Sequence, residues 1–139
     1  MARFLLLLLC VLAVALAACG AAPQGAAPVA SPADTPESVA KAALTALAAG
    51  DQAALTPLLG DELSSDARDD MRIQWRGSSC NTLQGVDVLG TRPAGSGTEV
   101  RLKARCAEAV DGLAFTLAPS GGTYRIVDWR MLPFEELEK

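Results

Sequence analysis

The 139-residue chain contains no histidine, and aromatic residues make up only 4% of it. Histidine is the side chain most often used as a general base and as a metal ligand, so its absence removes the commonest route to either chemistry. Acidic residues outnumber basic ones, 16 to 12, and the net charge of −4 leaves no basic surface for nucleic acid. We therefore expect no metal, no cofactor and no nucleic-acid partner.

An unbroken apolar run covers residues 4–18, after a single positive charge at Arg3. It is shorter than the ~20 residues that span a bilayer as a helix, and it fits the hydrophobic region of a secretory signal. The run ends in Leu16-Ala17-Ala18-Cys19, which resembles a bacterial lipobox. This resemblance implies that residues 1–18 are a cleaved signal peptide and that the Cys19 thiol carries a diacylglyceryl group. An ordinary cleavable signal and an uncleaved signal anchor are the alternatives.

Proline, glycine and alanine dominate residues 20–36 and leave no periodic apolar face. Such a composition is typical of a flexible linker. We expect residues 19–36 to comprise the lipidated Cys19 and a flexible tether, and residues 37–139 to form one domain. Large apolar residues are sparse in this domain, so a covalent crosslink would help to stabilise it.

Two cysteines, Cys80 and Cys106, lie within the expected domain, whereas Cys10 belongs to the apolar run. A cysteine pair in an exported domain indicates a disulfide. It would close a loop of about 25 residues and stabilise the fold by roughly 3 kcal/mol. Two free thiols, or part of a metal site, are the alternatives, although a metal site would lack further thiol and histidine ligands.

Helix signals fill the first half of the domain. Thr35, followed by a proline and an acidic residue, predicts a helix start, and Gly50 predicts its end. Asp51 is suited to cap a second helix, which Pro57 shortens or kinks. A third helix is expected from residue 64 or 65 to residue 77.

The apolar period then changes from about 3.6 to 2, which is typical of strands. In the clearest strand, Val100 and Leu102 share one face, while Arg101 and Lys103 lie on the other. The predicted strands cover residues 86–91, 99–107, 113–118 and 124–131. Helices followed by a four-stranded antiparallel meander predict an α+β fold, in which the N-terminal helices cover the apolar face of the sheet.

Two segments resemble NTF2-like (cystatin-like) domains. Residues 36–51 begin with Pro-Glu-Ser-Val-Ala and end the first helix in Gly-Asp, and residues 122–128 read Gly-Thr-Tyr-Arg-Ile-Val-Asp, like the final strand of that superfamily. The particular similarity is to small bacterial lipoproteins that carry such a domain of unknown function. This resemblance implies a strongly curved four-stranded sheet wrapped on helices, forming a cone that can hold a pocket.

Enzymes of that superfamily place a His–Asp pair, or a tyrosine with carboxylates, inside the cone. This chain has no histidine for such a pair, which leaves Asp87, Asp128 and Tyr124, and nothing in the sequence brings these three together. Trp75, Tyr124 and Trp129 are candidates to line a pocket. Packing in the core is the alternative for large aromatic side chains.

Arg101, Lys103 and Arg105 alternate along one face of the clearest strand. They form a candidate anion-binding strip for phosphate, a lipid headgroup or a wall polymer. The alternative is the solvated outer face of an antiparallel sheet, where long cationic side chains are common and discourage edge pairing.

Together these features favour a membrane-anchored extracytoplasmic binding or interaction module over an enzyme. Its expected partners are the membrane, through the lipid on Cys19, and an unidentified small molecule, envelope polymer or protein. A homodimer is a further alternative. The expected location is the extracytoplasmic face of the cell membrane or the outer membrane. A small cone-pocket enzyme of the isomerase or dehydratase type and a structural accessory of an envelope complex are the alternatives.

Overall fold

The computed structural model describes residues 35–138. The expected signal peptide, Cys19 and nearly all of the linker lie outside these residues. Within residues 35–138, no helix has the length and apolar character needed to span a bilayer.

Helix α2 (Pro36–Ala49) is the first element, and its two ends confirm the caps expected from the sequence. At the start, the Thr35 hydroxyl accepts a hydrogen bond from the Ser38 backbone N–H, and the Ser38 hydroxyl accepts one from the Thr35 N–H. At the end, Gly50 adopts the left-handed conformation with φ of 68°, which glycine tolerates without steric strain. Both caps satisfy backbone groups that the helix itself leaves unpaired.

Two short helical segments and one longer helix follow. Asp51 caps α3 (Gln52–Leu55) through the Ala54 N–H, and the chain tightens into a 3₁₀ turn, η2 (Thr56–Leu58), at Pro57. Proline lacks the N–H that would continue an α-helix, which explains the interruption. Ser64 then caps α4 (Ser65–Gly77).

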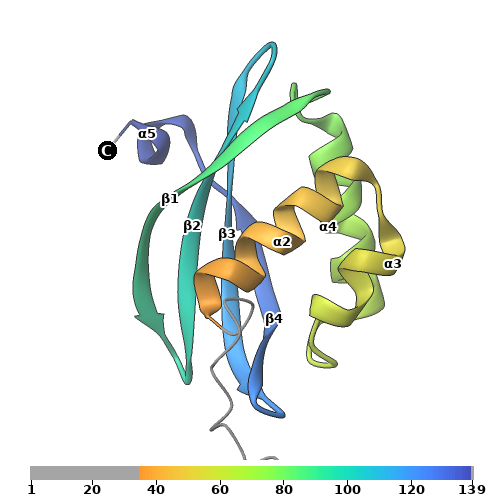
Figure 1. Cartoon of the computed structure of the whole chain (residues 1–139), viewed down its shortest axis with the longest axis vertical. Coiled ribbons are helices and arrows are strands. Elements are labelled where there is room, and N and C mark those ends of the chain that lie inside the picture. Colours follow the sequence, from red (N-terminus) through yellow and green to blue (C-terminus); the bar gives the residue numbers. More distant parts are fainter. Residues whose placement is uncertain (1–34, 139) are drawn as a thin grey trace, which may run out of the picture. The chain divides into compact units, whose positions relative to one another are not determined.

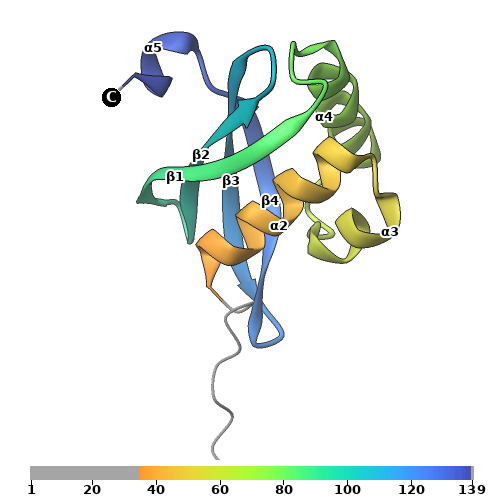
Figure 2. The same ribbon diagram turned by 45° about the horizontal axis from the view of Figure 1, so that its top comes forward.

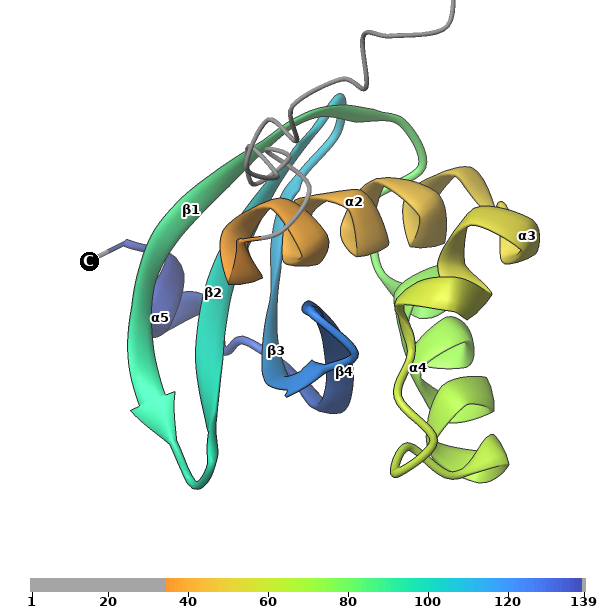
Figure 3. The same ribbon diagram turned by 60° about the horizontal axis from the view of Figure 1, so that its bottom comes forward.

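Four antiparallel strands form one meander in which every strand pairs with the next along the chain (Figure 1). They are β1 (Leu83–Ala94), β2 (Gly97–Cys106), β3 (Val110–Ser120) and β4 (Thr123–Met131). The α+β fold predicted from the sequence is therefore confirmed. The sheet curves around α2, which contacts all four strands (Figure 3).

Each strand is longer than the sequence pattern indicated, and β1 differs most. Its expected extent was residues 86–91, yet it runs over twelve residues and contains two register shifts against β2, at Leu83/Gly85 and at Val88/Gly90. Each shift interrupts the alternation of inward and outward side chains on which the strand prediction depends. Glycines and Pro93 within the strand further weaken its sequence signal.

The core fills the space between the helices and the concave face of the sheet. Val39, Ala43, Leu44 and Leu47 of α2 are buried there, as their spacing predicts. Met71 and Trp75 of α4 are also buried. The largest fully buried side chains are Phe115, Leu44, Leu55, Met71, Leu102, Leu113, Leu117, Ile126 and Val100.

The β4 edge of the sheet is covered by the segment after η2. Leu59 pairs with Ile126 in a parallel bridge, and the Gly60 N–H donates to the Ile126 carbonyl at 2.8 Å. On the same strand, the Trp129 indole N–H donates to the Ala67 carbonyl of α4 at 3.0 Å. These contacts hold the α3–α4 region beside β4 (Figure 2).

A short C-terminal helix, α5 (Phe134–Leu137), lies against the outer face of the sheet and was not expected from the sequence. Leu132 and Leu137 pack on Ala114 of β3 and form a second, smaller apolar cluster. Gly112 makes this approach feasible, because a Cβ at that position would collide with the Leu137 side chain. The outer face is therefore partly covered rather than wholly solvated.

Candidate functional site

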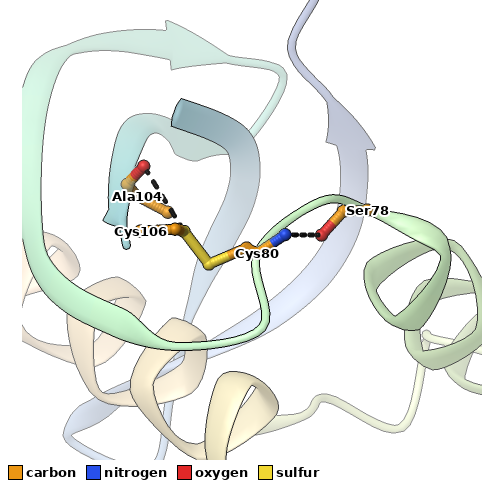
Figure 4. Close-up of a disulfide and its surroundings, with 4 residues drawn as sticks. All are labelled: Ser78, Cys80, Ala104 and Cys106. Carbon is orange, nitrogen blue, oxygen red and sulfur yellow. Dashed lines mark hydrogen bonds between the residues drawn. A yellow bond between two sulfur atoms is a disulfide. The ribbon is translucent and has the colours of Figure 1, made fainter. Parts of the chain in front are cut away.

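A disulfide joins Cys80, in the loop after α4, to Cys106 at the end of β2 (Figure 4). The Cα atoms are 5.2 Å apart, a normal separation for this bond, and the sequence separation is 26 residues. The pairing predicted from the sequence is confirmed, and the free-thiol and metal-ligand alternatives fall away. Since such bonds persist in oxidising compartments, the disulfide indicates an extracytoplasmic location.

The three aromatic candidates do not converge on one site. Trp75 is buried in the core with 4% exposure and borders a shallow cleft beside Cys80. Trp129 and Tyr124 are half-buried against the core, and Trp129 uses its indole N–H to hold the Ala67 carbonyl. Neither of these two residues lines the clefts found around α3 and α4.

The carboxylates named for a cone-pocket enzyme also lie apart from each other. Asp87 is on β1 and Asp128 is on β4, with two strands between them, and both are exposed. Asp87 forms an ion pair with Arg105, with 2.8 Å between its Oδ2 and the arginine Nε. Tyr124 lies on β4 opposite Pro119 and contacts neither carboxylate through a hydrogen bond or ion pair among residues 35–138.

The three residues of the expected anion-binding strip lie on the outer face of β2, and each has a partner within the chain. Arg105 pairs with Asp87, the Arg101 Nη1 lies 3.9 Å from Glu136 Oε2, and the Lys103 Nζ donates to the Leu137 carbonyl at 3.2 Å. Two of these partners belong to α5. An external anion would therefore compete with contacts that hold α5 in place.

Glu99, beside this strip on β2, was missed by the sequence reasoning. It is a buried charged residue with 7% exposure, and it lies between Arg92 of the neighbouring strand β1 and Arg130 of β4. Arg92 approaches its carboxylate at 2.9 Å and 3.1 Å, and Arg130 approaches it at 3.4 Å. Burial raises the pKa of Glu99, but the hydrogen bonds from Arg92 and Arg130 outweigh it and hold the pKa below its ordinary value.

A cleft of about 550 Å³ opens between α3–η2 and the first half of α4. None of its lining residues belongs to the sheet, and the core residues Leu55 and Leu63 reach it from the interior. Its walls combine an apolar floor with charged and hydroxyl side chains: Gln52, Leu55, Thr56, Leu59, Asp61, Leu63, Ser64, Ser65, Arg68, Asp69 and Arg72.

Arg68 is the best-fixed cation of this cleft. Its Nε donates to the Leu63 carbonyl and its Nη2 donates to the Gly60 carbonyl, both at 2.8 Å. Both acceptors are neutral, so neither offsets the positive charge. No sequence pattern indicates this role, because Leu63 and Gly60 approach Arg68 only after the turn between η2 and α4 has folded.

Arg72 separates this cleft from its neighbour. Its guanidinium donates to the Gln52 side chain on α3 and to Asp69 on its own helix. Gln52, Leu55 and Arg72 line both the first cleft and a second one of about 270 Å³ that reaches Trp75 and Cys80. The Arg72–Gln52 bond therefore forms the wall between two adjoining hollows.

No protein-family model, no curated protein sequence and no solved structure matches this chain. Within residues 35–138, no group of three or more cysteine, aspartate or glutamate side chains is arranged to hold a metal ion.

Proposed function

We propose that this protein is an extracytoplasmic lipoprotein, anchored through Cys19, whose NTF2-like domain acts as a binding or interaction module. The lipobox-like Leu16-Ala17-Ala18-Cys19 supports the anchor, and the Cys80–Cys106 disulfide agrees with export. Two acyl chains on Cys19 give stable attachment at about 0.8 kcal/mol per buried methylene, without a spanning helix. The order of helices before a curved meander supports the NTF2-like assignment.

The filled interior is the observation that favours binding over catalysis. A cone-pocket enzyme needs an enclosed cavity in which at least two ionisable groups converge. Here Phe115, Leu102 and Leu113 of the sheet are fully buried against Leu44 and Met71 of the helices. Asp87 and Asp128 lie outside this interior. Surface clefts beside α4 offer a ligand space outside this interior.

Lipid attachment is tested by expressing the full chain in a bacterium supplied with a fatty acid that carries a chemical label. We expect label on the wild-type chain and a mature N-terminus at residue 19. Cys19→Ser should lose the label and retain residues 1–18, because the cysteine is both the acceptor and the cleavage signal. Mass spectrometry of the N-terminal peptide reads out both events.

Cys10→Ser is the matched control, since it removes a thiol from the apolar run without touching the lipobox. It should be labelled and cleaved like the wild type. Label that persists on Cys19→Ser, or label lost equally from both variants, would refute attachment at Cys19. Membrane fractionation alone does not decide the question, because an uncleaved apolar signal also holds a chain in the membrane.

A further inference from the structure

We propose that the cleft between α3–η2 and α4 binds a small aliphatic zwitterion of the α-amino-acid type. Arg68 would take its carboxylate and Asp61 its ammonium group. This inference rests on the proposed binding function, but it does not depend on lipid attachment at Cys19. It assigns the ligand class from the charges and the apolar floor of the cleft.

The cleft has the size of a small-molecule site. Its volume of about 550 Å³ lies within the range of about 300–1,000 Å³ that is typical of ligand pockets. Its two walls come from separate elements, α3–η2 on one side and α4 on the other. Those elements are held at a fixed spacing by the Arg72–Gln52 hydrogen bond and by the two contacts from Arg68 to the intervening turn.

Arg68 supplies the anion-binding group. Within residues 35–138, no carboxylate oxygen lies within the 4.0 Å limit of an ion pair with its guanidinium. Its two bonds to neutral carbonyls use two of five N–H donors, so three remain for a ligand. A guanidinium held in one orientation loses less conformational entropy when it binds a carboxylate.

Among the other charged residues of the cleft, one carboxylate has no ion-pair partner within residues 35–138. Arg72 and Asp69 form an ion pair with each other. Asp61 lines the same cleft, and it forms no ion pair or side-chain hydrogen bond within the described part of the chain. Arg68 and Asp61, each without an ion-pair partner among residues 35–138, therefore line the same cleft, and Asp61 also borders an adjoining hollow lined by Arg125. A ligand that carries both charges satisfies both groups, whereas a simple anion leaves Asp61 unsatisfied and close to added negative charge.

The leucines of the cleft favour a ligand whose side chain, beside its two charged groups, is apolar. Leu55 and Leu63 are buried and form the floor, and Leu59 is half-buried at the side. An aliphatic side chain placed there loses water-exposed apolar surface, at roughly 25 cal/mol per Å². The combination of Arg68, Asp61 and leucines matches an aliphatic α-amino acid better than it matches a phosphate or a sugar.

The test uses three related probes and the full chain in detergent micelles, with binding measured by isothermal titration calorimetry. Leucine carries both charges, leucine amide lacks the carboxylate, and N-acetylleucine lacks the ammonium group. We expect leucine to bind at least about tenfold more tightly than either analogue, because each analogue leaves one charged group of the cleft without a partner. Inorganic phosphate serves as a fourth probe and should bind more weakly than leucine.

Two variants assign the charges to the residues. Asp61→Asn, in an exposed turn position, should make leucine and N-acetylleucine bind equally. Arg68→Gln should make leucine and leucine amide bind equally. Asp66→Asn is the matched control, since Asp66 is an exposed acid of the first turn of α4 that does not line the cleft, and it should leave all affinities unchanged.

Three results would overturn the assignment. They are no saturable binding of leucine to the wild type, equal binding of leucine and its two analogues, and an unchanged preference for leucine over N-acetylleucine in Asp61→Asn. Should Arg68→Gln fail to fold, the Asp61→Asn comparison still decides. A wild type that binds phosphate but not leucine is a case of the first result. Lipid labelling at Cys19 reports on the anchor independently of all these outcomes.

Discussion

Arg130, near the end of β4, donates two hydrogen bonds to the carboxylate of Glu136 on α5, at 3.2 and 3.1 Å. The same guanidinium reaches Glu99 of β2 at 3.4 Å. These contacts raise the pKa of Arg130, with the Glu136 hydrogen bond as the largest cause, and they lower the pKa of Glu136. One arginine therefore ties the C-terminal helix to the outer face of the sheet.

Removing the charge of Glu136 should loosen α5 without unfolding the domain. In Glu136→Gln, we expect amide hydrogen exchange at Leu132, whose N–H donates to the Gly112 carbonyl, to accelerate by about two- to fivefold, the scale of a surface ion pair. Nuclear magnetic resonance exchange measurements check this. Glu135→Gln is the matched control, since the neighbouring acid is exposed and forms no ion pair among residues 35–138. Equal acceleration in both variants would contradict the role given to Glu136.

Acid should destabilise the domain through Glu99. Its pKa in the folded protein lies below the ordinary value of 4.5, so the stability it contributes is complete above that pH and is lost as the pH falls through the lower, folded-state pKa. We expect the free energy of unfolding to change little between pH 7 and 5 and to fall below pH 4.5. Glu99→Gln should lower it by about 1–3 kcal/mol at pH 7, since Arg92 and Arg130 lose a charged partner.

Urea denaturation at pH 7, 5, 4 and 3 measures both effects. The Glu99→Gln variant should show a shallower decline between pH 4.5 and 3 than the wild type, because one titrating group has been removed. Glu135→Gln should keep the wild-type slope. Parallel declines in the wild type and Glu99→Gln would show that other carboxylates control the acid response.

Local signals in the sequence predicted the parts of this fold that depend on local interactions. The caps at Thr35 and Gly50 form hydrogen bonds with backbone groups only a few residues away. The alternation that places Val100 and Leu102 on one face of the strand identifies the buried face. The disulfide was predictable from the count of cysteines in an exported chain. These features need no knowledge of tertiary structure.

The parts that the sequence did not predict depend on residues far apart in the chain. Glu99 meets Arg130 across a separation of 31 residues, and its carboxylate is enclosed because β1 brings Arg92 and β4, two strands away from β2, brings Arg130. Helix α5 has too few residues for a periodic pattern, and it packs because Gly112 leaves room. The α3–α4 cleft likewise depends on Arg72 reaching the side chain of Gln52, 20 residues earlier in the chain.

Gly112 should tolerate no side chain. In Gly112→Ala, the new Cβ would collide with Leu137 and would lie 2.9 Å from the Leu102 carbonyl oxygen, which is backbone and cannot rotate away. We expect a loss of about 1–3 kcal/mol in unfolding free energy, the usual cost of overpacking. Gly77→Ala is the control, because nothing lies within 4 Å of a Cβ there. Comparable losses at both positions would refute the close approach of α5.

The disulfide should contribute a large share of the stability of this small domain. Replacing Cys80 and Cys106 together by alanine removes a crosslink that spans 26 residues, and we expect a loss of about 3 kcal/mol. Thermal unfolding of the double variant and of the wild type, each with and without reductant, measures this. Reductant should destabilise the wild type alone. A double variant as stable as the oxidised wild type would show that the core needs no crosslink.

Truncating Phe115 and Phe134 to alanine tests whether the interior of the domain is close-packed. Phe115 is fully buried at the centre of the sheet, whereas Phe134 at the start of α5 is 63% exposed. Phe115→Ala should therefore cost about 3–5 kcal/mol, because it leaves a cavity among side chains that have no room to collapse. Phe134→Ala should change the stability by less than about 0.5 kcal/mol. Urea denaturation of the two variants gives both values.

The size of the Phe115 effect bears on function as well as on stability. A domain with an open cone would already hold solvent beside Phe115, so truncation would enlarge an existing hollow and cost well under 3 kcal/mol. A loss within the expected range would instead mean that no preformed chamber exists there for a substrate. The ligand would then have to bind at a surface hollow, where Arg68 and Asp61 line the cleft beside α4. A small loss from Phe115→Ala would restore the cone-pocket enzyme as the better hypothesis.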